Sequence, residues 1–185
     1  MRLTAIILGL AITGLATAAV AQTAADGQAA VTGSVSNVCV LGAPSPAAIN
    51  LGQLSSTSGP RAGKLSTIAD QTVNLPSSWC NFGGTRLSIS STALLAADTS
   101  TPPPGFTRAV NFNSSVTTWG SPNAQVTTNA AANGSSATAN GDSGVQADPR
   151  AASLSLQLSQ FSAPGDGFLV TGAYAGSVTI TLGPE

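Results

Sequence analysis

Few residues of this 185-residue chain could take part in catalysis or metal binding. It has two cysteines, Cys39 and Cys80, and no histidine. A reactive cysteine needs a nearby base or positive charge to lower the pKa of its thiol, and no lysine or arginine stands close to Cys39 in the sequence. Zinc sites use histidine and cysteine sets that the chain does not offer. We therefore expect the cysteine pair to be structural, with no catalytic thiol, metal or cofactor.

Carboxylates are the remaining candidates for general acid–base chemistry. The acidic residues are Asp26, Asp70, Asp98, Asp142, Asp148, Asp166 and Glu185. The aspartates lie in turn-like stretches rich in Gly, Pro and Ser, where an Asp side chain tends to bond its own backbone. A glycosidase-type carboxylate pair remains a minor alternative. The stretch "ANGDSG" (139–144) has the wrong acidic spacing for an EF-hand calcium loop. The sequence predicts a protein that is not an enzyme.

The N-terminus has the pattern of a secretory signal. Arg2 precedes an apolar run over 5–20 that ends in small residues, which predicts a signal peptide over 1–21, cleaved after Ala21. A retained membrane anchor is the alternative. Export places the chain in an oxidising compartment, where two cysteines most simply form one disulfide, Cys39–Cys80.

The charge pattern excludes one class of partner. Charged residues make up only 7% of the chain. Without the signal, five basic residues stand against seven acidic ones, a net charge of about −2. The basic residues are Arg61, Lys64, Arg86, Arg108 and Arg150. They are too few and too dispersed to follow a phosphate backbone, so we expect no binding to nucleic acid.

The elements expected to position these residues are short strands. "TRLSISS" alternates Leu87 and Ile89 with polar residues, the pattern of a strand with one buried face. No sustained helical period follows the signal. Strands are expected near 31–39, 49–54, 72–75, 86–90, 106–119, 123–129, 152–161 and 177–182. Their Gly-, Pro- and Ser-rich connections predict an all-β sandwich over 31–185. The polar stretch 130–150 is expected to be a long loop, disordered at its middle.

Two blocks of sequence resemble a known family. "TGSVSNVC", "INLGQLSS" and "QTVNLPSSWC" are similar to the N-terminal half of chaperone–usher pilin subunits and of spore-coat-U-like secreted pilin domains, and "TGAYAGSVTITL" is similar to their last strand. The matching positions are Gly33, Val35, Cys39, Leu51, Gly52, Leu54, Leu75, Cys80, Gly172, Tyr174, Val178, Ile180 and Leu182. The match covers about half of the mature chain, at its two ends.

The resemblance implies an immunoglobulin-like sandwich that lacks one strand. A periplasmic chaperone would fill the gap first, and then the N-terminal extension of the next subunit would replace it at the outer-membrane usher. The donor strand would be the extension 22–30, with Gln22, Ala24, Asp26, Gln28 and Ala30 on one face. The closing strand for chaperone or subunit pairing would present Tyr174, Val178, Ile180 and Leu182. The chain would then pass through the periplasm into a fibre (a fimbrium) at the cell surface, serving adhesion or biofilm formation.

Other readings stay open at this point. The extension offers only alanines and a glycine as apolar residues, which also suits a tip, terminal or stand-alone subunit. The second function is a self-complete secreted module that binds carbohydrate or surface matrix. Its binding platform would use aromatic residues, of which the candidates are Trp79, Trp119, Phe82, Phe106 and Phe112. Such aromatic residues more often fill a sandwich core than bind a sugar.

Overall fold

The computed structural model describes residues 26–185, so the signal peptide expected over 1–21 and the donor positions Gln22 and Ala24 lie outside the described residues. The chain divides into an N-terminal unit that ends at Val35 and a compact unit, Ser36–Glu185. Within residues 26–185 the regular elements are strands and two single-turn 3₁₀ helices, which confirms the predicted all-β class.

The strands are β1 (Cys39–Val40), β2 (Gln71–Cys80), β3 (Thr85–Ala96), β4 (Phe106–Thr107), β5 (Ala109–Thr117), β6 (Ala124–Thr127), β7 (Thr138–Asp142), β8 (Arg150–Ser162), β9 (Phe168–Leu169) and β10 (Tyr174–Pro184), and the 3₁₀ turns are η1 (Gly59–Arg61) and η2 (Pro164–Asp166).

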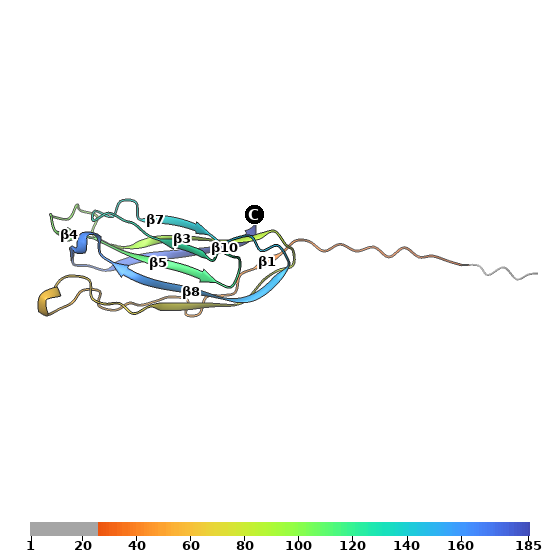
Figure 1. Cartoon of the computed structure of the whole chain (residues 1–185), viewed down its shortest axis with the longest axis horizontal. Helices are drawn as coiled ribbons and strands as arrows, with labels where there is room; N and C mark the ends of the chain where they lie inside the picture. The colour runs from red at the N-terminus through yellow and green to blue at the C-terminus, as the bar shows by residue number, and fades with distance from the viewer. Residues whose placement is uncertain (1–25) are drawn as a thin grey trace, which may run out of the picture. The chain divides into compact units, whose positions relative to one another are not determined.

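The longer strands form two layers that β5 joins. One layer runs β1-β2-β8-β5, with β6 beside β5, and the other holds β10, β3 and β7. The start of β5 bonds β3 through Val110 and Ala109, while the rest of β5 bonds β8. All of these pairings are antiparallel. Figure 1 shows β3, β5, β8 and β10 running side by side.

The core lies between the layers because each long strand points alternate side chains inward. Leu87 and Ile89 of β3, as the alternation predicts, are almost fully buried. They pack with residues of the other layer, among them Val73, Leu75, Cys80, Val116, Leu154 and Leu156. Val178, Ile180 and Leu182 of β10 pack against this cluster but are only partly buried.

The compact unit has two ends, which we call the base and the tip. The base holds the disulfide, and there Cys80 pairs with Arg150 and Thr85 with Pro184. The tip is where β10 begins, opposite the end of β3, with Tyr174 paired to Ala96. The short parallel pair β4–β9 and the two 3₁₀ turns lie at the tip (Figure 1).

Two expected strands near the N-terminus do not form as predicted. In the stretch expected as a strand over 31–39 only Cys39 enters a ladder, and residues 31–38 are exposed. Residues 49–54 belong to no strand. Both stretches have suitable β-branched or alternating residues, yet a strand also needs a hydrogen-bonding neighbour, which local sequence does not supply.

The expected disorder of the polar stretch 130–150 is wrong, because its middle forms β7. Residues Thr138–Asp142 pair with Ser88–Thr92 of β3. A Cβ on Gly141 would lie 2.3 Å from the carbonyl oxygen of Gln125, so the absence of a side chain lets β7 approach β6. A stretch of small residues can therefore be ordered here, because its backbone hydrogen bonds to the edge of β3 stabilise it in place of buried large side chains.

The two tryptophans differ in burial, and this generates a stability prediction. Trp119 is 1% exposed and part of the core, whereas Trp79 is 37% exposed. We expect Trp119→Ala to lower the free energy of unfolding by about 3–5 kcal/mol. The matched Trp79→Ala should cost about 1 kcal/mol, since more of its side chain already faces water. Denaturant unfolding of both variants measures this. Equal losses would contradict the burial seen here.

Candidate functional site

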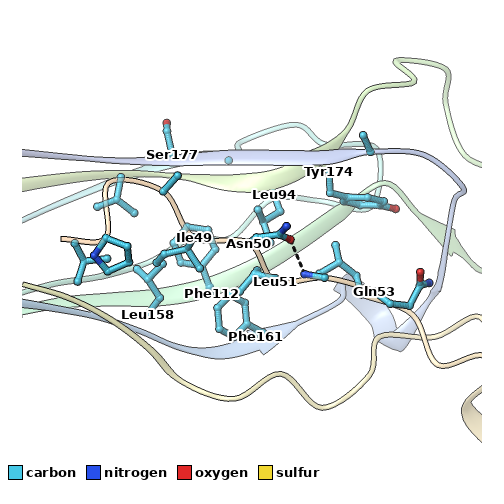
Figure 2. A pocket seen from close by; sticks show the side chains of 18 of the residues that line it. Ile49, Asn50, Leu51, Gln53, Leu94, Phe112, Leu158, Phe161, Tyr174 and Ser177 are labelled. Atoms are coloured by element: carbon cyan, nitrogen blue, oxygen red, sulfur yellow. Dashed lines mark hydrogen bonds between the residues drawn. The ribbon is translucent and has the colours of Figure 1, made fainter. Parts of the chain in front are cut away.

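A groove of about 970 Å³ opens beside the last strand. One wall is the segment 46–54, and the other runs from Leu169 through the first half of β10. The floor consists of apolar side chains from β2, β3, β5 and β8, namely Val73, Leu75, Leu94, Phe112, Leu156, Leu158 and Phe161. Figure 2 shows Ile49, Phe112, Leu158 and Phe161 gathered in the middle of the groove and Tyr174 toward one end. Its size is at the upper end of the range for ligand pockets.

The first wall has free backbone groups. Within the described chain, residues 46–53 make no backbone–backbone hydrogen bond, whereas Ser45 bonds Asn74 just before and the Leu54 carbonyl accepts from Ser66 just after. Local bonds shape the segment instead: the Asn50 side chain accepts from the Gly52 N–H at 2.9 Å, and Gly52 has φ +68°. Such an Asx turn bends the chain out of a regular ladder. The wall therefore offers unpaired N–H and C=O groups beside apolar side chains.

The second wall is an open sheet edge. β10 pairs with β3 on one side, and no strand among residues 26–185 pairs with its other side. Of the closing-strand residues named from the sequence, Tyr174, Val178 and Ile180 line the groove, and Leu182 lies beyond it toward the base. An edge strand with free backbone groups is a ready template for another strand.

Tyr174 fixes the tip end of the groove. Its hydroxyl donates to the carbonyl oxygen of Val170 at 3.0 Å, with the carbonyl of Thr107 at 3.4 Å. A tyrosine hydroxyl is protonated at neutral pH and can donate, and burial raises the pKa of Tyr174 further above its ordinary value of 10.0. The bond holds the turn between β9 and β10 in place.

A cluster of opposite charges joins the two walls at the tip. We call the contact between hairpin 55–66 and the 164–169 turn the clasp. Asp166 accepts from Arg61 at 2.8 Å and from Lys64 at 2.9 Å, and the Leu169 N–H donates to the Gly63 carbonyl at 2.8 Å. Hydrogen bonds from Lys64 and then Arg61 hold the pKa of Asp166 below its usual 3.8. The sequence did not point to the clasp, because its partners lie about a hundred positions apart.

The described part of the N-terminal unit, residues 26–35, makes no backbone–backbone hydrogen bond to any other described residue. The donor positions Asp26, Gln28 and Ala30 lie in it and are exposed, and none belongs to a strand. The stretch continues with Val31 and Val35, which are 94% and 87% exposed. Val31, Gly33 and Val35 occupy alternate positions, with Thr32 and Ser34 between them. Its apolar alternation is that of a strand with one face to bury.

The other candidate residues are placed apart from the groove. The predicted disulfide Cys39–Cys80 is confirmed, and it lies at the base. Asp98 accepts hydrogen bonds from the backbone and then the side chain of Ser100, which lower its pKa. Asp70 accepts from Gln157, and Glu185 pairs with Arg86. Each of these three carboxylates thus bonds a different polar neighbour.

Burial of Trp119 removes it from any binding platform, so the carbohydrate hypothesis loses that residue. Phe112 lies in the groove floor, while Trp79 and Phe106 are partly exposed at opposite ends of the compact unit. Among residues 26–185, no group of three or more potential His, Cys, Asp or Glu ligands comes together. In the same residues no helix has the length and apolar character needed to span a membrane.

The clasp generates a prediction about local opening. Asp166→Asn removes the charge that both cations share, so we expect faster hydrogen exchange across 56–66 at neutral pH, with exchange in β3 unchanged. Asp98→Asn is the matched control, because Asp98 bonds only within its own turn. In the unsubstituted protein Asp166 is ionised at neutral pH and the pairs are complete; they are lost as the pH falls below 3.8 and through the lowered pKa of Asp166. Unchanged exchange in Asp166→Asn would show that the clasp does not hold the hairpin.

No protein-family model, curated protein or solved structure matches this chain.

Proposed function

We propose that this protein is a secreted, non-enzymatic structural subunit of a bacterial surface fibre. Subunits would assemble by strand addition: the N-terminal segment of one copy lies in the groove of another and completes an immunoglobulin-like sandwich. The observation that carries the proposal is the groove itself. It has an apolar floor, and both of its walls have unpaired backbone groups. A β-strand is the ligand that satisfies both features, since its backbone bonds the walls while alternate side chains enter the floor.

The chain itself contains a segment suited to the groove. Residues 29–35 place Ala29, Val31, Gly33 and Val35 on one face, and the two valines are almost fully exposed. The proposed donor therefore extends beyond 22–30 to Val35, and its groove face is the odd-numbered one, opposite to the face of Gln28 and Ala30 named from the sequence. Two large apolar side chains left in water are a cost that burial in an apolar groove would remove, at about 25 cal/mol per Å².

The remaining parts of the proposal follow from the resemblance. A periplasmic chaperone would shield the groove before assembly, an outer-membrane usher would export the subunit, and the fibre would serve adhesion or biofilm formation. The neutral surface suits assembly as well, because a net charge near zero leaves little repulsion between copies.

Deleting residues 22–35 tests the donor. We expect the chain from its native host to form multimers that survive SDS and collapse on boiling without reductant. The deletion should abolish them while leaving the sandwich folded, because these residues lie outside the compact unit. Multimers that persist in the deletion would rule out strand donation by this segment.

Two neighbouring substitutions test the proposed face. Val31→Asp would bring a carboxylate into the apolar floor, a cost of several kcal/mol, and should remove the SDS-resistant multimers. Thr32→Asp is the matched control: it adds the same charge one position away, on the opposite face, and should leave them. The readout is the ladder of unboiled samples. Loss in both variants, or in neither, would contradict the assigned face.

A further inference from the structure

The exposed large apolar side chains of the compact unit gather at its two ends. Those of Ser36–Glu185 are Val38, Val40, Trp79, Phe106, Val145 and Phe168. Val145 precedes Gln146, which bonds Thr85, so it belongs to the base with the first three. The two phenylalanines are at the tip. Water-exposed apolar residues confined to the ends, with polar strands between them, are typical of an interaction surface rather than of random exposure.

The base patch is built on neighbouring strands. Val40 of β1 faces Trp79 of β2, and Trp79 faces Ala151 of β8. Cross-strand partners point to the same side of a sheet, so the three side chains form one row. A shallow depression of about 340 Å³ lies beside Trp79, lined also by Pro149 and Arg150. We call Val38, Val40, Trp79 and Ala151 the base patch.

The tip pair is built on the short parallel strands. The rings of Phe106 and Phe168 lie 5.5 Å apart between centroids, and each residue is 41% exposed. Lys64 lies 5.5 Å from the centre of the Phe168 ring. Phe168 immediately precedes Leu169, which lines the groove. The tip pair therefore stands beside the mouth of the groove at its tip end.

Strand direction decides which end of one copy meets which end of the next. All pairings in the two main layers are antiparallel, and an added strand that follows this pattern runs antiparallel to β10. Since β10 runs from tip to base, the donor would run from base to tip and leave the groove at the tip. The donor chain then continues from Val35 to Val38, and three residues span at most about 10 Å. The base patch of the donating copy is thus tethered next to the tip pair of the accepting copy.

We propose that the base patch of one copy packs against the Phe106–Phe168 pair of the copy whose groove holds its N-terminal segment. This second contact rests on the proposed strand addition. It would bury exposed aromatic and valine side chains from both copies and restrict the angle between successive subunits. The partner is a second copy of this chain, because only the covalent link at residues 36–38 brings these two surfaces together.

An engineered disulfide tests the contact. The variant carrying Ala151→Cys and Phe106→Cys places one thiol in the base patch and one in the tip pair of each chain. The two thiols are at opposite ends of a single copy and can bond only between copies. After mild oxidation we expect a ladder that survives boiling in SDS and collapses with reductant, whereas the unsubstituted multimers collapse on boiling alone.

Control variants separate the outcomes. Ala151→Cys alone should give no covalent dimer; a dimer would mean that base meets base, as a parallel donor would require, and would overturn the inference. The second control carries Ala151→Cys and Gln157→Cys, with its second thiol in the middle of β8, and should give no covalent ladder. A covalent ladder like that of the Ala151→Cys/Phe106→Cys variant would mean unspecific contact and would also overturn the inference.

The failure of each proposal has its own signature. In one outcome, the Ala151→Cys/Phe106→Cys variant shows SDS-resistant multimers in unboiled samples but no boiling-resistant ladder after oxidation. That result would overturn the end-to-end contact and leave strand addition standing. If the unsubstituted chain forms no SDS-resistant multimers, strand addition fails and the inference fails with it.

Discussion

A strand with a hydrogen-bonding neighbour on only one side leaves a row of polar backbone groups that need partners. Among residues 26–185, β10 has such an edge, and it borders a groove whose opposite wall, residues 46–53, also lacks backbone–backbone hydrogen bonds. The two facing rows lie over an apolar floor that includes Phe112, Leu158 and Phe161. An extended chain would be a ligand for both features: its backbone would hydrogen-bond the free backbone groups of β10, and its side chains would cover the partly buried side chains of β10. The proposed assembly depends on this constraint.

Contacts elsewhere in the compact unit hold the two walls of the groove in place. The disulfide ties the chain that leads into the first wall to β2 at the base, and Ser45 bonds Asn74 of β2 where the wall begins. Asn81 adds bonds to the backbone of Val38 and Ser36. At the tip, the clasp joins hairpin 55–66 to the turn before β9 through Asp166. The walls are therefore fixed at both ends and unpaired in between. The proposed occupant would replace missing bonds and disrupt none of those that hold the walls.

The two kinds of end contact differ in strength. The clasp pairs are solvent-exposed, and ion pairs of this kind contribute little to stability individually. The disulfide is covalent and restricts the unfolded chain as well as the folded one. The base of the groove is thus the firmer end and the tip the more easily opened one, which is also the end at which an antiparallel donor would leave.

The sequence by itself determined the all-β class, the cysteine pairing and most of the long strands. Leu87 and Ile89 show why: a strict alternation of apolar and polar residues has one structural solution when one face is buried. The strand expected at 177–182 forms as part of β10, and three of the four residues named for the closing strand line the groove.

Only the tertiary structure decided which of the expected strands find a neighbour. Residues 49–54 alternate as a strand does, yet among the described residues 49–53 make no backbone–backbone hydrogen bond, while the polar stretch 138–142 becomes β7 because β3 offers it an edge. The groove floor, the clasp and the tip pair join residues far apart along the chain. Whether a segment pairs and is buried depends on which strand lies next to it in the fold, and the alternation of residues along one segment does not specify that neighbour.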